Sequence, residues 1–516
     1  MLAKSKSSSP GEEDALDSEI DTPFTTFDNY LSSESNIREG RWKSSAKVNI
    51  RYYDQNAEVQ EPEVKGASLL DFLVTSNFTG KKTAAQIEIG DTTIEQSKNT
   101  VDSLTRRGGQ ANVTFGNITV SGFGVLSKES GYKTDGLGFG FNANDHIMGA
   151  STKIKFFDQQ ISIKGIYTRG GEHENSMGNW SDEEGGRKGD VTGIVMTTDF
   201  FSQLFTTDFE FDTINYDHDS DEKDDTVYDK AYRIRIGGLT EIYDYDLSYK
   251  YSGPQYEVIG NQSIIRDWAG FDFNIGATYP AHTLRMLSNY SWDNVEDNSL
   301  YARIFSFTGG LDYQYSGWEK FPISLLFEHN RQKSEDEPVD TDPTTLETNT
   351  LTGCVSFNDS SWSLEFQSSY SEQDDKEKYD YDTQFFTFSV VPSYTYTSFS
   401  IVPSWSFNSS LDQATEIRTE TNTLTLDVYV GFFRDIVTCE FGGTYDWTQT
   451  DSNSIDMNNT ALYSRLNYQM EKLWWLENSS VALEYKFNRQ EDKPNNSKFS
   501  ETTLMLVLST AIPHSF

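Results

Sequence analysis

The densest group of potential metal ligands in this sequence is a run of closely spaced carboxylates. Carboxylate oxygens are the ligands that Ca²⁺ and Mg²⁺ prefer, so the run predicts a weak divalent-cation site, although its spacing does not match the calcium loop of an EF-hand. The alternative is a solvated acidic surface, which is the commoner role of such runs. The residues concerned are Asp217, Asp219, Asp221, Glu222, Asp224 and Asp225.

Catalytic chemistry has no comparable signal in the sequence. The histidines are scattered without metal-ligand spacing, and nothing places a nucleophile beside a base. The glycine-rich segment 136–141 is not a dinucleotide-binding loop, because such a loop needs a strand before it and a helix after it. We therefore predict no catalytic residue, no cofactor and no enzymatic activity.

Composition narrows the class of protein further. The 516 residues carry 42 basic and 80 acidic side chains, a net charge of −38, which argues against nucleic-acid binding. Hydrophobic residues make up only 36% and mean hydropathy is −0.61, yet aromatic residues reach 14%. A soluble core needs more aliphatic residues and a disordered chain has fewer aromatics. A membrane barrel fits both values, because only alternate residues face lipid.

Apolar and polar residues alternate along much of the chain. In 399–408, for example, Phe399, Ile401 and Trp405 alternate with Ser400 and Ser404. Successive strand residues point to opposite faces, so this pattern predicts strands with one apolar and one polar face. The sequence has no apolar run of about 18 residues that could form a transmembrane helix.

The connections between these strands alternate between short turns and long polar loops. Tight links fall near Asp158, Pro280, Thr397 and Asp435, and long links at 170–188, 218–229, 255–266, 335–347, 413–420 and 493–501. This alternation is typical of bacterial outer-membrane barrels. Counting from Ser44 predicts an all-β, single closed antiparallel barrel of about 24 strands, in a range of roughly 22 to 26, with short periplasmic turns and long acidic extracellular loops. Segment 129–150 is the least regular part and is either an extra strand or an inward-folded loop.

This pattern divides the chain into two parts. Residues 1–43 are polar without a clear period, and we expect a disordered periplasmic leader or a plug segment there. Residues 44–516 form the predicted barrel. Cys354 and Cys439 fall on opposite faces of different predicted strands, so no disulfide is expected.

Charged residues within the predicted strands are in phase with the polar face. A lipid-facing arginine or lysine costs about 2–4 kcal/mol at the bilayer midplane, so a barrel places such residues in its lumen. The predicted lumen-facing charges are Arg233, Arg235, Asp244, Asp246, Lys250, Asp272, Arg285, Glu328, Glu365, Asp427, Glu440, Glu484 and Lys486.

The C-terminal segment resembles the closing strand of Gram-negative outer-membrane β-barrel proteins. Leu504, Leu506 and Leu508 alternate with polar residues up to the terminal Phe516, although His514 stands where an aromatic residue is commoner. The resemblance implies an integral outer-membrane protein in contact with lipid and lipopolysaccharide, with Phe516 read by the barrel-assembly machinery. The segment around Gly90 and Arg107 resembles strand-and-turn sequences of pilus ushers, although the flanking usher domains are not recognisable.

A large porin-like barrel without a folded plug domain predicts a wide pore or channel for solutes, in which acidic lumen charges favour cations. One alternative is a structural sheath around a partner protein, as in porin–cytochrome conduits that enclose a multihaem cytochrome. Another is a conduit for a secreted polymer. A fourth, a soluble β-rich secreted protein, is consistent with the start of the sequence, because Met1 is not followed by an apolar signal core. For an outer-membrane protein we expect a signal peptide that is missing here.

Overall fold

The computed structural model describes residues 2–8, 26–55, 65–127, 145–172, 186–218, 226–261, 263–377, 381–473 and 476–511. The first half contains β1 (Leu2–Ser8), β2 (Thr26–Glu39), β3 (Trp42–Gln55), β4 (Lys65–Thr79), β5 (Thr83–Ile94), β6 (Leu104–Phe115), β7 (Ile118–Val125), β8 (His146–Phe156), β9 (Ile161–Glu172), β10 (Arg187–Phe200), β11 (Phe205–Asp217), β12 (Thr226–Leu239) and β13 (Tyr243–Ser252). The second half contains β14 (Trp268–Tyr279), β15 (His282–Asp293), β16 (Arg303–Tyr315), β17 (Ile323–Glu335), β18 (Thr345–Asn358), β19 (Trp362–Asp375), β20 (Thr383–Tyr396), β21 (Phe399–Asp412), β22 (Ile417–Phe432), β23 (Val437–Thr450), β24 (Asp456–Leu473), β25 (Leu476–Asp492) and β26 (Ser497–Ala511). Within these ranges no helix is long and apolar enough to cross a membrane.

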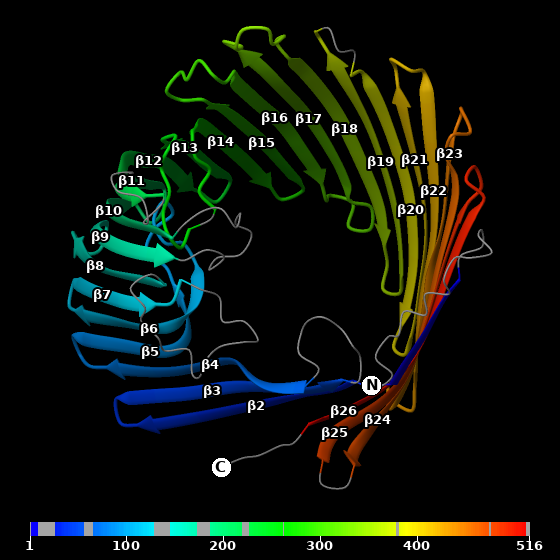
Figure 1. Cartoon of the computed structure of the whole chain (residues 1–516), viewed down its shortest axis with the longest axis horizontal. Helices are drawn as coiled ribbons and strands as arrows, with labels where there is room; N and C mark the ends of the chain where they lie inside the picture. The colour runs from blue at the N-terminus through cyan, green and yellow to red at the C-terminus, as the bar shows by residue number, and fades with distance from the viewer. Residues whose placement is uncertain are drawn as a thin grey trace.

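The strands form one antiparallel sheet that follows chain order from β2 to β26. β1 joins the far edge, where Leu2 pairs with Leu506 and Ser8 with Ser500. In Figure 1 the strands follow one another around a ring, and β1 and β2 come from the two ends of the sheet. Between the described parts of β1 and β2 there is no strand pairing. The predicted all-β, antiparallel class is confirmed.

The sheet begins earlier in the chain than the sequence pattern indicated. β2 lies wholly inside 1–43, and β3 begins at Trp42, ahead of the predicted start at Ser44. The C-terminal half of β2 is exposed and mostly polar on both faces, so it lacks the alternation that identifies a strand. Its strand conformation follows from continuous backbone pairing with β3, from Thr26–Gln55 to Glu39–Trp42.

One face of the sheet carries exposed apolar side chains on strand after strand. Soluble monomers rarely expose contiguous apolar patches of more than a few hundred Å². Members of this apolar face include Ile89, Met196, Phe211, Ile234, Leu247, Ile275, Met286, Leu311, Phe327, Leu351, Phe366, Leu424, Leu426, Phe441, Leu466, Leu483, Leu504, Leu506 and Leu508.

The opposite, polar face is the concave one. The loop after β5 reaches β11, six strands along the sheet, where Asn99 donates hydrogen bonds to Glu210 and Asp212. Such a contact is sterically open only across the inside of a curved sheet. Hydroxyl pairs bridge neighbouring strands on this face, for example Thr352 with Ser369 at 2.8 Å.

Turns at one rim are short and those at the other are mostly longer. β14 and β15 are joined through Pro280 and Ala281 alone, whereas 253–267 connects β13 to β14 and 336–344 connects β17 to β18. The predicted alternation of link lengths is therefore present. Several predictions fall wholly or mostly outside the described residues: the segment 129–150 with its glycine-rich part 136–141, the long links 170–188 and 218–229, the C-terminal Phe516 and all but one residue of the acidic run. Cys354 and Cys439 are free thiols on β18 and β23.

Candidate functional site

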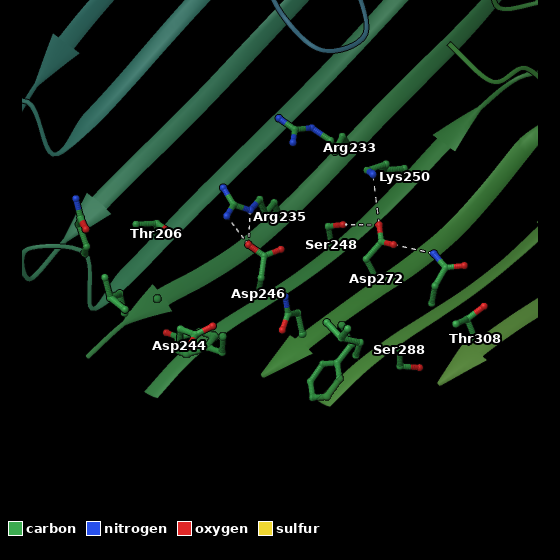
Figure 2. A pocket seen from close by; sticks show the side chains of 18 of the residues that line it. Thr206, Arg233, Arg235, Asp244, Asp246, Ser248, Lys250, Asp272, Ser288 and Thr308 are labelled. Atoms are coloured by element: carbon green, nitrogen blue, oxygen red, sulfur yellow. Dashed lines mark hydrogen bonds and ion pairs between the residues drawn. The ribbon is translucent and has the colours of Figure 1, made fainter. Parts of the chain in front are cut away.

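A charged cavity of about 870 Å³ is lined by residues from β10 to β16, most of them on β12 to β15. Figure 2 shows side chains from neighbouring strands directed into it. Alternation places charges from β12, β13 and β14 on one face, and antiparallel register aligns them, so that Arg233 stands opposite Lys250 and Ser248 opposite Asp272. Six sequence-predicted lumen charges meet here: Arg233, Arg235, Asp244, Asp246, Lys250 and Asp272.

Most charges in this cavity are paired. Arg235 Nε donates to Asp246 Oδ2 at 2.5 Å, and Lys250 Nζ lies 3.3 Å from Asp272 Oδ2. Asp272 also accepts hydrogen bonds from Ser248 at 3.0 Å and Asn289 at 2.7 Å, so it links three strands (Figure 2). The wall of the cavity is thus polar, and its cations are largely neutralised.

Asp244 differs from the other carboxylates of the cavity. Among the described residues no ion pair involves it. A Cβ on Gly276 would stand 2.2 Å from Asp244 Oδ1, so the glycine opposite leaves room for this carboxylate. Asp244 therefore supplies negative charge to the cavity without a neighbouring cation.

The other predicted lumen charges lie elsewhere around the sheet. Glu440, on β23, stands opposite Arg465 of β24, and Arg465 Nε lies 3.4 Å from Glu484 of β25. Asp427 accepts a hydrogen bond from Tyr463 at 2.6 Å. Arg285, Glu328, Glu365 and Lys486 lie on β15, β17, β19 and β25 and do not line the cavity.

Two loops fold onto the concave face beside this cavity. We name 95–103, which joins β5 to β6, the first inner loop, and the described residues 253–261 and 263–267 between β13 and β14 the second inner loop. Val101 and Tyr256 are fully buried, and with Val258 and Ile259 they pack against apolar side chains of the wall. The wall residues in this cluster are Ile94, Leu104, Phe123, Val125, Ile147, Val191, Ile214, Tyr216 and Ala231. The predicted external link at 255–266 is therefore an inward loop, because its apolar side chains find a core only inside the sheet.

The two inner loops are bonded to each other. Asn261 Nδ2 donates to the carbonyl oxygens of Thr100 at 2.7 Å and Lys98 at 3.1 Å, and the Tyr256 hydroxyl donates to Asn99 O at 2.9 Å. Burial raises the pKa of the Tyr256 hydroxyl well above its usual range, so it remains a donor. The loops therefore form one unit.

A second cavity, of about 400 Å³, separates this unit from β12 to β14. Ile264, Ile265 and Trp268 give it an apolar side, and Lys98 and Asp102 of the first inner loop give it a charged rim. The Asp102 carboxylate, 2.9 Å from Lys98 Nζ, raises the pKa of that amine through a hydrogen bond. Arg233 and Lys250 line both cavities, so the two spaces adjoin.

The acidic run is described only at its first residue. Asp217 ends β11, is buried, and lies 3.1 Å from Lys188 Nζ. In the described ranges no group of three or more histidine, cysteine or acidic side chains is placed to hold a metal ion. The cation site stays a prediction.

Several residues that organise the site were not singled out in the sequence. Asp208 pairs with Arg233 at 3.0 Å, and Glu210 and Asp212 follow it on the same face of β11. These acidic residues alternate with Phe209 and Phe211, and this alternation is a sequence signal that they share the polar face of a strand. Glu257 had no such signal, because its partner Arg187, at 3.0 Å, is 70 residues away in the sequence.

Fold and site together define a large antiparallel β-sheet with an apolar outer face and a charged concave face. No family model matches the sequence, and no curated protein matches it either.

Solved structures to which this chain shows a distant similarity include an outer membrane protein, a translocation pore and a ferric preacinetobactin receptor. The outer membrane protein OpdK from Pseudomonas aeruginosa is 9% identical, with 63% of this chain and 93% of that chain covered and a TM-score of 0.28. The translocation pore of the P pilus usher PapC is 9% identical, with 95% and 96% covered and a TM-score of 0.36. BauA, the ferric preacinetobactin receptor from Acinetobacter baumannii, is 9% identical, with 98% and 79% covered and a TM-score of 0.39. At TM-scores this low, none of these proteins informs the function of this chain.

Proposed function

We propose that this chain is a closed β-barrel of a bacterial outer membrane that forms a wide pore for solutes. The observation that carries the proposal is the inversion of polarity across the sheet: apolar side chains are exposed on the convex face, and charges and hydroxyls line the concave face. In water such an apolar belt would drive aggregation, whereas in a bilayer its side chains contact the lipid acyl chains. Lipid and lipopolysaccharide would contact this belt.

The directions of the strands at the two edges of the sheet support closure of the barrel. Neighbouring strands from β2 to β26 are antiparallel, so β2 and β26 run in the same direction. β1 is antiparallel to β26 and hence also to β2. Insertion of β1 between the two edges closes the ring with antiparallel neighbours throughout, and a closed ring leaves no unpaired backbone in lipid.

The number of strands supports a wide lumen. With strands about 4.8 Å apart and tilted by roughly 40°, a circular ring of 26 strands would measure about 50 Å between opposite backbones. The two inner loops pack against only part of the wall, from β5 to β12. Water and hydrated solutes would pass along the rest of the lumen.

The pore is tested by reconstitution of the full chain into planar bilayers. We expect stable conductance steps, and with the acidic wall a reversal potential that favours cations in a salt gradient. A chain that stays monodisperse in detergent-free buffer and gives no conductance would overturn the proposal.

Asp244 is expected to contribute to ion selectivity. In Asp244→Lys the cation-to-anion permeability ratio should fall by roughly a factor of two at 10 mM salt, where the Debye length is about 30 Å, and by less at 0.15 M, where it is about 8 Å. Glu319→Lys, in the turn between β16 and β17, makes the same charge change away from the cavity and should leave the ratio nearly constant. Equal effects of the two variants would contradict a role for the cavity wall.

A second candidate function is a sheath around a partner, such as a multihaem cytochrome, or around a secreted polymer. The observation that favours it is the hydroxyl-bearing wall of β18 to β22, with pairs such as Ser363–Ser393 at 2.6 Å, which lies outside the cluster formed by the two inner loops. Purification from the native membrane separates the candidates. A stoichiometric haem-containing partner and a silent bilayer would select the sheath.

A further inference from the structure

The first inner loop is held against the wall by two carboxylates of one strand. Asn99 N donates to Glu210 Oε1 at 2.9 Å, and Asn99 Nδ2 donates to Asp212 Oδ2 at 3.1 Å. Glu210 is 1% exposed and Asp212 is 0% exposed, because the loop covers both. A single asparagine thus binds two buried carboxylates.

The second inner loop is held by a different set of contacts. Arg187, at the start of β10, lies 3.0 Å from Glu257 and also pairs with the buried Glu172. A Cβ on Gly170 would stand 2.5 Å from Ile259 Cβ, so the wall has a glycine where this loop approaches closely. Because the loops are bonded to each other, release of either one disturbs the other.

The carboxylates under the first loop are incompletely satisfied. Asp212 Oδ1 is buried without a hydrogen-bond partner. Glu210 Oε2 is also buried without one, and its nearest cation atom, Arg233 Nε, lies 3.7 Å away. A buried polar atom that lacks a hydrogen-bond partner is costly, and opening of the loop would hydrate both carboxyl groups. Burial of the apolar cluster favours the closed loop. The position of the loop is therefore set by two opposed free energies, the gain from apolar burial and the cost of the unsatisfied carboxyl atoms.

From this balance we infer that the two inner loops form one gate, with Asn99, Glu210 and Asp212 as its latch. The open state frees the wall under the loops and joins the two cavities through Arg233 and Lys250, which line both. This inference rests on the proposed pore, since a gate needs a lumen to regulate. The latch itself is defined by contacts within the chain.

Thiol labelling of position 101 tests the gate. Val101 is 0% exposed and Val339, in the loop after β17, is 91% exposed. In a chain carrying Cys354→Ser and Cys439→Ser, a water-soluble maleimide should label Val101→Cys much more slowly than Val339→Cys. Added Asn99→Ala removes the Nδ2 hydrogen bond to Asp212, leaves the backbone bond to Glu210, and should speed labelling of position 101 about tenfold.

The opposite response is expected from the carboxylate side. Asp212→Asn keeps an acceptor for Asn99 and replaces one of the two buried carboxyl groups of the latch by a neutral amide, so labelling of position 101 should slow several-fold. Asp312→Asn is the matched control, because this carboxylate of β16 accepts a hydrogen bond from Gln314 and lies outside the latch. Heat-modified gel mobility of each variant verifies that the barrel is folded.

The outcomes separate the gate from the pore. The labelling rate could change in Asn99→Ala and Asp212→Asn although the chain gives no conductance. This result would support the latch contacts but overturn the pore, and with it the gating role. If the chain conducts but the labelling rate is the same in both variants as in the parent, the gate alone is overturned. The same holds if position 101 is as reactive as position 339.

Discussion

An arginine in place of Leu424 is expected to lower the free energy of unfolding in lipid vesicles by about 2–4 kcal/mol, the cost of this side chain on the lipid face near the bilayer midplane. Leu424 lies near the middle of β22, points away from the concave face and is 46% exposed. Denaturant titration of the refolded chain in vesicles, followed by tryptophan fluorescence, measures the change.

The adjacent residue provides the control. Thr425 pairs with Ser404 and Thr444 on the concave face, so Thr425→Arg places the same side chain in the lumen. We expect a change of less than about 1 kcal/mol there, because a lumenal charge stays hydrated. Similar losses at both positions, or none at either, would contradict the assignment of the apolar face to lipid.

The strands of the second half could be predicted from the sequence because their two faces meet different environments. In β22, Leu424 and Leu426 are exposed on one face, while Thr423 and Thr425 stand on the other. A residue period of two is sufficient to read such a strand, and no knowledge of distant contacts is required. β1 and β2 lack the pattern, and their conformation depends on strands to which they pair.

The inner loops could not be predicted in the same way. Asn261 and Thr100 are 161 residues apart in sequence, and their contact exists only because the sheet curves. The apolar residues Tyr256, Val258 and Ile259 in an otherwise polar link were the available signal. They indicate burial, but the sequence does not specify the wall against which they pack.

The charged cavity was predictable in part. Phase alone assigns Arg235 and Asp246 to the polar face, and both line the cavity. Their ion pair depends on the register between β12 and β13, in which Asp246 stands opposite Gly237, diagonal to Arg235. Register is set by turn length and by packing over the whole hairpin, so pairing is not evident from one strand.

Arg107→Ala is expected to lower the free energy of unfolding by about 3–5 kcal/mol, the usual effect of removing one partner from a buried ion pair. Arg107 is 0% exposed and binds Asp91 through Nε and Nη2, both at 3.1 Å. The ion pair lies where the pairing between β4 and β5 ends. There Asp91 accepts a hydrogen bond from Phe72 N at 2.9 Å, and Arg107 donates one to Leu70 O at 3.3 Å. Gly90, with a φ of +125°, lets the chain approach Phe72 there. Alanine would leave the Asp91 carboxylate without its cation and would remove the hydrogen bond that Arg107 donates to Leu70 O.

Two further variants test whether the destabilisation comes from the broken ion pair or from the loss of any arginine side chain. Arg331→Ala removes an exposed arginine, 3.4 Å from Glu347, and should cost less than about 1 kcal/mol. Arg107→Met combined with Asp91→Leu replaces both charges by apolar side chains and should recover most of the loss, since the penalty comes from an unpaired buried charge. If the double variant is as unstable as Arg107→Ala, the stabilising contribution lies instead in the contacts of Arg107 and Asp91 to the backbone of β4, and the seam between β4 and β5 depends on those hydrogen bonds.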